Sequence, residues 1–486
     1  MTNRIKSILV DQIKQGRGKK AVQEATLQQW VDRTFLCPTG SKIKYYILNP
    51  LNDDYVPFAS DLNVAKYLAA CGFFNGIAQG EEETKKEFEA RKKYFLLSYL
   101  KEVVETRRVH AVMEVAGHQA GIIAQGLDRI LVTRGPQIIE PQRDKEGQWV
   151  RTLIEQMTGD GALRVHLWLA RAYQCLVDQK HAFGHVLIMI GPNSCGKSLL
   201  QHRVFTPVLG GREIECFRQL SGATHFNKTA SGCEHLFSED PSKPKDFDRQ
   251  RLADEIKRKA AVAVEYTEGK NVDAVATKAV VQRVSISINA DDLSMVPAFK
   301  PDTSDKLLVI ACKAPDILKG LSEKEIEPLI EADLPGYLWW LQNKLKPGDL
   351  VLSEDSEELS TIRRFGFKSF IDETYREAIE QESDAENLRN LIHEKYFPEA
   401  KPGEKITGPS PDFHCLRSHV MFLDLLNDPR VGKSIDREIK NQTRFGTLMM
   451  NLCRKYPSEF LFKVPKNKKF YTITRPKCEK EPSREG

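Results

Sequence analysis

No pair of cysteines in the sequence has the spacing C-x-x-C, although there are ten cysteines, and none of the eleven histidines belongs to an H-E-x-x-H motif. These two patterns are common signatures of structural zinc sites and of zinc proteases, so the sequence argues against both kinds of site. Scattered cysteines without a paired spacing are typical of a reducing compartment. We therefore expect a protein of such a compartment that holds no structural zinc.

The sequence also has little of what secretion or membrane insertion requires. The opening segment MTNRIKSILVDQIKQGRGKK contains no apolar core of a signal peptide. No apolar run elsewhere approaches the ~20 residues that a membrane span needs. We therefore expect a cytoplasmic protein without membrane contact.

The length of 486 residues and an apolar content of 41% are those of a folded protein with about three domains. The net charge is only +5, but residues 401–486 hold 18 Lys and Arg against 10 Asp and Glu, which leaves −3 for everything before them. Basicity is thus a property of the C-terminal end. That end is the expected contact for DNA or for another partner.

One stretch, HVLIMIGPNSCGKSLL, carries the clearest chemical signal. It contains the pattern G-x-x-x-x-G-K-[ST] directly after a buried-strand signature and directly before a helix-compatible run, which is the context that a phosphate-binding loop requires. Glycines let backbone N–H groups close around phosphate oxygens, and the helix N-terminus adds positive potential. The alternative is a chance Gly-rich turn. The expected ATP-binding residues are Gly191, Pro192, Asn193, Ser194, Cys195, Gly196, Lys197 and Ser198, with Lys197 on the phosphates and Ser198 on Mg²⁺.

An acidic pair follows at a spacing that suits the same α/β domain. In GCEHLFSEDPSKP, Glu239 and Asp240 end a short, mostly apolar run, 42 positions after Lys197. An ATPase needs carboxylates at a strand end to hold Mg²⁺ and to polarise the attacking water. We expect Asp240 to contribute to the Mg²⁺ site. Acidic pairs at turns are also common without any catalytic role.

The next strand ends in a polar residue. QRVSISINADD alternates Val284, Ile286 and Ile288 and ends in Asn289, which can reach the γ-phosphate and the attacking water from a central strand. Its alternative role is simply to end the strand in a turn.

Before this strand lie two β-rich arms with Lys270 at their tip and Lys278 on the return arm, which could contact a phosphate backbone. The alternative is a solvent-exposed edge hairpin whose lysines prevent aggregation and do not bind DNA.

The remaining chain divides into four further segments. Residues 1–110 mix strands with an amphipathic helix expected to bury Phe88, Tyr94, Phe95 and Leu100, and residues 111–184 form an approach to the ATPase core of 185–350. Residues 351–412 are a helical and linker segment. Residues 413–486 indicate helices followed by two strands with a basic turn, the order of a winged-helix domain. Its expected DNA contacts are Lys466, Lys468 and Lys469.

The order of phosphate loop, acidic pair, Lys-tipped hairpin and strand ending in Asn resembles superfamily 3 helicases, and more closely the helicase half of phage and plasmid primase-helicases of the poxvirus type. The resemblance covers roughly residues 110 to 315, from AGIIAQGLDRILVT to SDKLLVIAC. It implies Walker A at Lys197 and Ser198, Walker B at Glu239 and Asp240, and sensor 1 at Asn289. It also implies that Lys270 is the DNA-hairpin lysine.

The same resemblance implies a fold and an assembly. The family core is an AAA+-like α/β domain, usually in a hexameric ring that pulls single-stranded DNA with central hairpins. Many members place an arginine finger after sensor 1, where this sequence has Asp305-Lys306-Leu307-Leu308. Either Lys306 supplies the charge to the neighbouring subunit or another residue does.

We therefore predict an α/β protein with an AAA+-like P-loop core, an N-terminal α+β accessory region and a C-terminal winged-helix-like domain. The predicted function is an ATP- and Mg²⁺-dependent DNA helicase in phage, plasmid or prophage replication, with single-stranded DNA, possible duplex DNA and its own copies as partners. Residues 1–110 show no primase active site, so a primase or polymerase would be a separate polypeptide. The alternatives are a P-loop ATPase that remodels or packages without unwinding, and an initiator that binds DNA after ATP-driven assembly.

Overall fold

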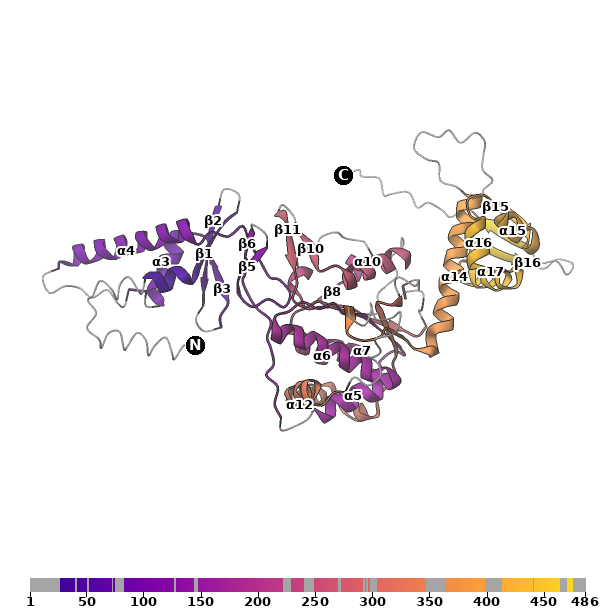
Figure 1. Cartoon of the computed structure of the whole chain (residues 1–486), viewed down its shortest axis with the longest axis horizontal. Coiled ribbons are helices and arrows are strands. Elements are labelled where there is room, and N and C mark those ends of the chain that lie inside the picture. The colour runs from indigo at the N-terminus through magenta and orange to yellow at the C-terminus, as the bar shows by residue number, and fades with distance from the viewer. Residues whose placement is uncertain are drawn as a thin grey trace, which may run out of the picture.

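The computed structural model describes residues 27–39, 42–49, 52–71, 73–74, 83–125, 128–143, 147–221, 229–239, 249–269, 272–291, 293, 296–297, 304–346, 364–397, 413–439, 441–463 and 470–474. Figure 1 shows these residues as an N-terminal part, a central α/β part and a C-terminal part, spread along the long axis of the chain. The long helix α14 (Glu373–Tyr396) leads from the central part into the C-terminal one.

The N-terminal part is an antiparallel sheet with two helices. Its strands β1 (Thr34–Thr39), β2 (Lys42–Leu48) and β3 (Tyr55–Phe58) pair in chain order, and α3 (Asp61–Ala70) and α4 (Lys85–Thr106) pack on them. Helix α4 begins at a capping box of Thr84 and Glu87, which satisfies N–H groups that the first turn leaves without partners. The predicted helix is confirmed.

The predicted buried face of α4 is confirmed only in part. Leu100 is buried and Phe95 packs against the core, but Tyr94 is 73% exposed. Tyr99 and Val103 occupy the core instead, because the helix turns the line through residues 96, 99, 100 and 103 toward the sheet. The Tyr99 hydroxyl lies 2.6 Å from the Thr34 hydroxyl, so this buried polar group has a partner.

A second small sheet connects this part to the centre. Strand β4 (Ala111–Met113) pairs in parallel with β6 (Asp128–Val132), which pairs antiparallel with β5 (Gly121–Gln125). These short strands lie within the approach segment 111–184.

The centre of the molecule is a six-stranded parallel sheet. Its spatial order is β14-β13-β7-β12-β9-β8. The bounds are β7 (Val186–Gly191), β8 (Glu213–Glu215), β9 (His235–Glu239), β12 (Arg283–Asn289), β13 (Leu307–Ala311) and β14 (Phe370–Ile371). Every pairing in this sheet is parallel. The predicted α/β class with a parallel sheet is therefore confirmed.

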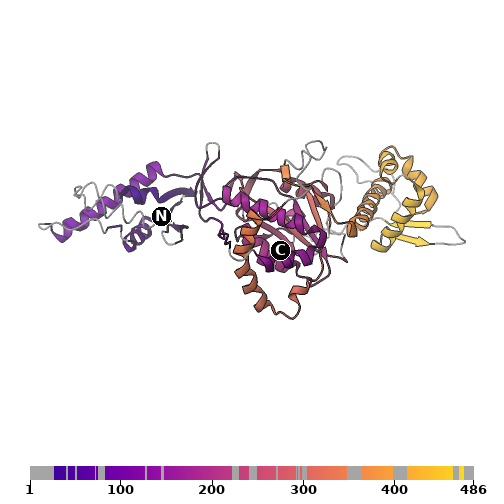
Figure 2. The same ribbon diagram turned by 60° about the horizontal axis from the view of Figure 1, so that its bottom comes forward.

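Helices cover both faces of this sheet, so its strands are buried on both sides. On one face lie α5 (Gln148–Thr158), α6 (Ala162–Asp178), α12 (Glu323–Asn343) and the helix after the phosphate loop; the other carries α9 (Phe217–Leu220) and α10 (Arg249–Ala261). Figures 1 and 2 show α5, α6 and α12 gathered beside the sheet. Helices α5 and α6 lie in the approach segment 111–184, and α12 lies in the core segment 185–350.

The alternating apolar and polar side chains of β12 point to opposite faces of the sheet. Val284, Ile286 and Ile288 enter the core on the α10 face. Ser285 and Ser287 are equally buried but point to the opposite face, because successive side chains of a strand alternate. That face of the sheet therefore carries a buried polar strip.

Between α10 and β12 the chain forms the predicted hairpin. Strands β10 (Val264–Gly269) and β11 (Val272–Lys278) pair antiparallel, and Val264 opposes Lys278 at the root. Lys278 is therefore at the root of the hairpin, with an exposed side chain. Lys270 lies outside the described residues.

The C-terminal part folds around its own core. Strand β15 (Phe413–Arg417) precedes α15 (Ser418–Leu426), α16 (Gly432–Glu438) and α17 (Gln442–Lys455), and β16 (Phe460–Lys463) pairs with β17 (Phe470–Thr474). The sheet order is β15-β17-β16, so β15 adds a strand that the sequence did not predict. Lys466, Lys468 and Lys469 lie outside the described residues, and the winged-helix classification stays a prediction.

Candidate functional site

Three strands bring the predicted ATPase residues to one edge of the central sheet. Gly191 ends β7, Asn289 ends β12 and Glu239 ends β9. Strand β12 lies between the other two, and its Asn289 is in register with Gly191 while its Ser287 is in register with Glu239. Because all three strands are parallel, their carboxyl ends share this edge, which is where ligands bind in open α/β sheets.

The phosphate loop leaves β7 through a close backbone contact. A Cβ atom on Gly191 would lie 2.4 Å from the carbonyl oxygen of Cys312, which follows β13. Ser194 and Gly196 have φ angles of 57° and 97°, so the loop twice takes the left-handed conformation before the helix begins at Lys197. Such a turn points successive N–H groups into one concavity. Pro192, Asn193 and Ser194 are exposed, and so is Ser198 in the first helical turn.

Lys197 lies under this loop. Its Nζ donates to the carbonyl oxygens of Gly191 and Pro192, at 3.1 and 2.8 Å, and is 3.4 Å from Oδ1 of Asn289. Cys195 is buried beside it, with Sγ 3.8 Å from Nζ. The structure therefore brings together the loop lysine and the polar strand end that the sequence placed 92 positions apart.

Glu239 lies at the same edge and has a partner that the sequence did not reveal. Nε2 of His202 is 2.8 Å from Oε1 of Glu239, and Nδ1 of the same ring is 2.9 Å from both carboxylate oxygens of Glu213. His202 belongs to a π-helix (Leu200–Phe205) that directly follows the first turn after the phosphate loop. Single π turns inside helices often mark functional sites. Asp240 lies outside the described residues.

The buried polar strip of β12 connects to these groups. Gln201 donates from Nε2 to Oγ of Ser285 at 2.7 Å, and Nε2 of His235 lies 2.8 Å from the same Oγ. Nδ1 of His235 is 2.6 Å from the Thr206 hydroxyl, which in turn donates to Glu213. Complete burial, with a smaller effect of His202, lowers the pKa of His235 to about 3, so its ring is neutral.

No sequence motif pointed to His202, Glu213 or Gln201. The only available signal is that Gln201 and His202 follow Lys197 by four and five positions, which places polar side chains in a helix that otherwise enters the core. No group of His, Cys, Asp and Glu side chains in the described ranges is arranged to hold a metal ion on its own. For Mg²⁺ with its water and phosphate ligands, Ser198 and Asp240 remain the expected protein groups.

Lys306 lies at the amino end of the central sheet, opposite the edge that carries the phosphate loop. This residue directly precedes β13, and its carbonyl oxygen accepts a hydrogen bond from the N–H of Val186 at the start of β7. Its side chain is only 8% exposed and pairs with Asp305 at 2.5 Å. A charge offered to a neighbouring subunit has to reach the surface, whereas Lys306 is buried at the amino end of the strands.

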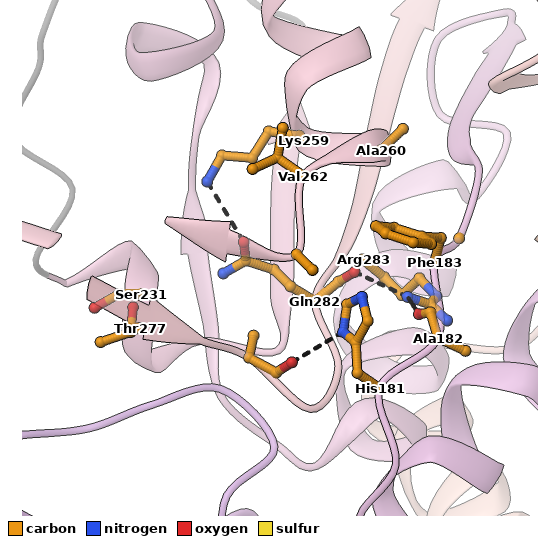
Figure 3. A pocket seen from close by; sticks show the side chains of 13 residues that line it. His181, Ala182, Phe183, Ser231, Lys259, Ala260, Val262, Thr277, Gln282 and Arg283 are labelled. Carbon is orange, nitrogen blue, oxygen red and sulfur yellow. Dashed lines mark hydrogen bonds between the residues drawn. The ribbon is translucent and has the colours of Figure 1, made fainter. Parts of the chain in front are cut away.

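A cavity of about 30 Å³ lies at that amino end, where the hairpin meets the sheet. Figure 3 shows the hydrogen bonds around it: Lys259 donates to Gln282, His181 bonds the Ala279 carbonyl, and Arg283 donates to the carbonyls of Ala182 and Gln282. A Cβ atom on Gly184 would lie 2.3 Å from Nε of Arg283, so the guanidinium packs directly on the backbone before β7. These contacts fix the hairpin root and lie away from the phosphate loop.

No protein-family model matches the chain, and no curated protein matches it in sequence. Several solved structures are similar in arrangement. One is an apo structure of the NrS-1 C-terminal region in its A form, which is 12% identical in sequence to this chain. The alignment covers 93% of this chain and 98% of that one, with a TM-score of 0.48. A second apo structure of that region is also 12% identical over the same shares, with a TM-score of 0.46.

A helicase structure is also among these neighbours. The X-ray structure of JCV helicase is 15% identical, covers 50% of this chain and 59% of its own length, and has a TM-score of 0.26. Among the described helices, none is long and apolar enough to cross a bilayer.

Proposed function

We propose that this chain is a Mg²⁺- and ATP-dependent DNA helicase of the superfamily 3 type, which moves on single-stranded DNA during phage, plasmid or prophage replication. The observation that carries the proposal is the contact of Lys197 with both the loop carbonyls and Asn289 at the edge where Glu239 ends its strand. A phosphate loop, a strand-end carboxylate and a polar strand end between them are the parts that ATP hydrolysis requires.

Each residue has a role in this proposal. Lys197 contacts the β- and γ-phosphates, while the loop N–H groups surround them. Ser198 and Asp240 hold Mg²⁺, Glu239 orients and activates the attacking water, and Asn289 contacts the γ-phosphate and that water. Bound Mg²⁺ would neutralise charge on the β- and γ-oxygens.

The DNA-binding parts of the proposal lie outside this edge. Lys270 and Lys278 of the β10–β11 hairpin contact the phosphate backbone of a single strand. The C-terminal part is a winged-helix-like domain whose Lys466, Lys468 and Lys469 contact duplex DNA; the succession of α15, α16 and α17 with the paired strands β16 and β17 supports it. The central part is an AAA+-like core that assembles as a ring of copies of this chain. A separate primase or polymerase, in the cytoplasm of the host, completes the replication machinery.

Two assays on the full chain test this function. ATP hydrolysis is measured with and without single-stranded DNA, and displacement of a labelled strand is followed with ATP and Mg²⁺. The proposal predicts stimulated hydrolysis and displacement, and loss of both in Lys197→Ala. Stimulated hydrolysis without displacement would favour a remodelling or packaging ATPase. ATP-dependent assembly on duplex DNA with negligible turnover would favour an initiator.

A second variant tests whether the hairpin contacts DNA. Lys270→Ala is expected to leave basal hydrolysis intact and to remove the stimulation by single-stranded DNA, because the hairpin is distant in sequence and fold from the phosphate loop. Lys101→Ala, on the exposed surface of α4 in the N-terminal part, is the matched loss of one positive charge. If Lys270→Ala keeps the full stimulation, the hairpin is not the DNA contact.

A further inference from the structure

The ring of His202 lies between the ends of two neighbouring strands. Its Nδ1 faces the carboxylate of Glu213 on β8, its Nε2 faces Glu239 on β9, and its plane meets the Phe237 ring at 79° with centroids 4.6 Å apart. The side chains of His202, Glu213 and Glu239 are 30%, 31% and 34% exposed, so the trio is half-buried.

The two contacts between the His202 ring and the carboxylates of Glu213 and Glu239 each need one proton. A neutral imidazole has one N–H donor, while two ionised carboxylates offer only acceptors. Both ring nitrogens lie within 2.9 Å of a carboxylate oxygen, so both contacts are hydrogen bonds only if the trio holds one extra proton. With a proton on each ring nitrogen, His202 would donate to both carboxylates at once.

A chain of hydrogen bonds holds Glu213 in place behind the ring. Thr206 donates its one hydroxyl proton to Glu213, and neutral His235 has a single N–H, so these two groups set the direction of the chain. Gln201 donates to Ser285, Ser285 donates to Nε2 of His235, Nδ1–H of His235 donates to Thr206, and Thr206 donates to Glu213. The Thr206 hydroxyl also lies 3.0 Å from the Gln201 carbonyl oxygen, and Nε2 of Gln201 lies 3.2 Å from the Ser285 carbonyl oxygen. Glu213 is left with lone pairs directed at Nδ1 of His202.

We propose that His202 is the positioning residue of Glu239: anchored on Glu213 through Nδ1, its ring holds Oε1 of Glu239 through Nε2 and leaves Oε2 to accept a proton from the attacking water. This rests on the proposed function, since it assumes that Glu239 activates water. The ionic contact is a charge-assisted hydrogen bond, which holds a carboxylate in one orientation. Partners of this kind, one step behind a reacting group, change activity by about 10–100-fold when removed.

Two amide substitutions separate the two nitrogens of His202. In His202→Gln the amide nitrogen reaches the position of Nε2 and can donate to Glu239. In His202→Asn the shorter side chain reaches only the position of Nδ1 and can donate only to Glu213. We expect His202→Asn to lower kcat for ATP about 10–100-fold with little change in KM, and His202→Gln to recover most of it.

Arg203→Gln is the matched control in the same π-helix. Arg203 is 46% exposed and pairs with Glu327 on α12, away from Glu239. We expect wild-type kcat and KM. If His202→Asn hydrolyses ATP at the wild-type rate, or if Asn and Gln lose kcat equally, the positioning role is overturned while a hydrolysing wild type leaves the proposed function intact.

The charge of the ring is tested without any turnover. Nitrogen NMR of histidine-labelled protein at neutral pH, with the His202 signals assigned from their loss in His202→Gln, reports whether each ring nitrogen carries a proton. Both nitrogens of His202 are expected to be protonated. A neutral His202 ring would overturn the proposal even in a working ATPase. Absence of ATP hydrolysis in the wild type would instead overturn the proposed function and, with it, the role of Glu239.

Discussion

Nζ of Lys197 lies 3.4 Å from Oδ1 of Asn289, and the backbone of Asn289 is in register with Gly191 on the neighbouring strand. The strand that ends in Asn289 is inserted between the strand of the phosphate loop and the strand of Glu239. A γ-phosphate bound by the loop would therefore face a polar side chain from the strand between the loop and the carboxylate. This arrangement places the expected contacts for binding and for hydrolysis at separate residues, which can be tested separately.

Lys197 and Glu239 are expected to differ in what their loss removes. Lys197→Ala should abolish nucleotide binding, because it removes the cation that contacts the phosphates. Glu239→Gln should keep nucleotide affinity within about threefold and lower kcat by at least about a hundredfold, because only the base for water is lost. Calorimetric titration with ATP and steady-state hydrolysis measure the two effects. Equal loss of affinity in both variants would contradict the separate roles.

Gly191 is expected to resist even the smallest substitution. In Gly191→Ala the new Cβ would lie 2.4 Å from the Cys312 carbonyl oxygen, so the backbone of β7 or of the segment after β13 has to move. We expect a loss of about 1–3 kcal/mol in unfolding free energy, measured by denaturant titration. The control is Gly446→Ala in α17, where a Cβ meets nothing within 4 Å and alanine is the better helix former. If both variants keep wild-type stability, the close approach of the Cys312 carbonyl does not require glycine at position 191.

Lys306 is expected to act on stability and not on catalysis. Its side chain is buried beside Asp305 at the amino end of β13. Lys306→Ala should lower the unfolding free energy by about 1–3 kcal/mol, since it removes a charged partner from a mostly buried pair. Turnover per folded chain should stay within about twofold of wild type in ATP assays. A stable Lys306→Ala chain that binds ATP but fails to hydrolyse it would restore the trans-acting role.

Glu459 is expected to make the C-terminal part sensitive to acid. Burial alone would raise its pKa, but hydrogen bonds from His393 and from Arg389, with both guanidinium contacts at 2.9 Å, bring the pKa down to about 2. An unfolded Glu has a pKa of about 4.3, so the folded state favours the ionised form. The resulting stability is fully present above about pH 4.3 and is lost as pH falls through about 2.

Hydrogen exchange of the α17 amides, compared between wild type and Glu459→Gln, isolates this contribution. Protection in the wild type should exceed that of the variant at neutral pH, and the difference should shrink as the pH approaches about 2. A difference that stays constant across this range would show that the ion pair does not stabilise this part of the chain.

The sequence predicted the elements of the site well where periodicity and motif coincide. Val284, Ile286 and Ile288 alternate and end in Asn289, and the structure has β12 over these residues. The phosphate loop follows β7 as its motif requires. The sequence alone could not predict Ser285 and Ser287 as buried polar residues. The partners of Ser285, Gln201 and His235, come from segments that only the fold brings together.

The errors have equally local causes. Tyr94 and Tyr99 both suit an apolar helix face, and only the direction in which α4 packs decides which one is buried. The role of Lys306 is implied by the resemblance to superfamily 3 helicases, but a position in a motif does not tell at which end of a strand a residue lies or whether it is buried. His202 carries no motif, and its importance arises from two carboxylates 11 and 37 positions away.

The central claim is that ATP hydrolysis at this edge drives strand separation, and a strand-displacement assay tests it most directly. Full-length chain, Mg²⁺ and a partial duplex carrying a labelled strand are combined with ATP, with a nonhydrolysable ATP analogue, or with ATP and the Glu239→Gln variant. The account predicts displacement with ATP and the wild-type chain alone, together with hydrolysis stimulated by the single-stranded tail. Displacement that is equal with the analogue, or ATP hydrolysis by the wild type without any displacement on tails of either polarity, would contradict it.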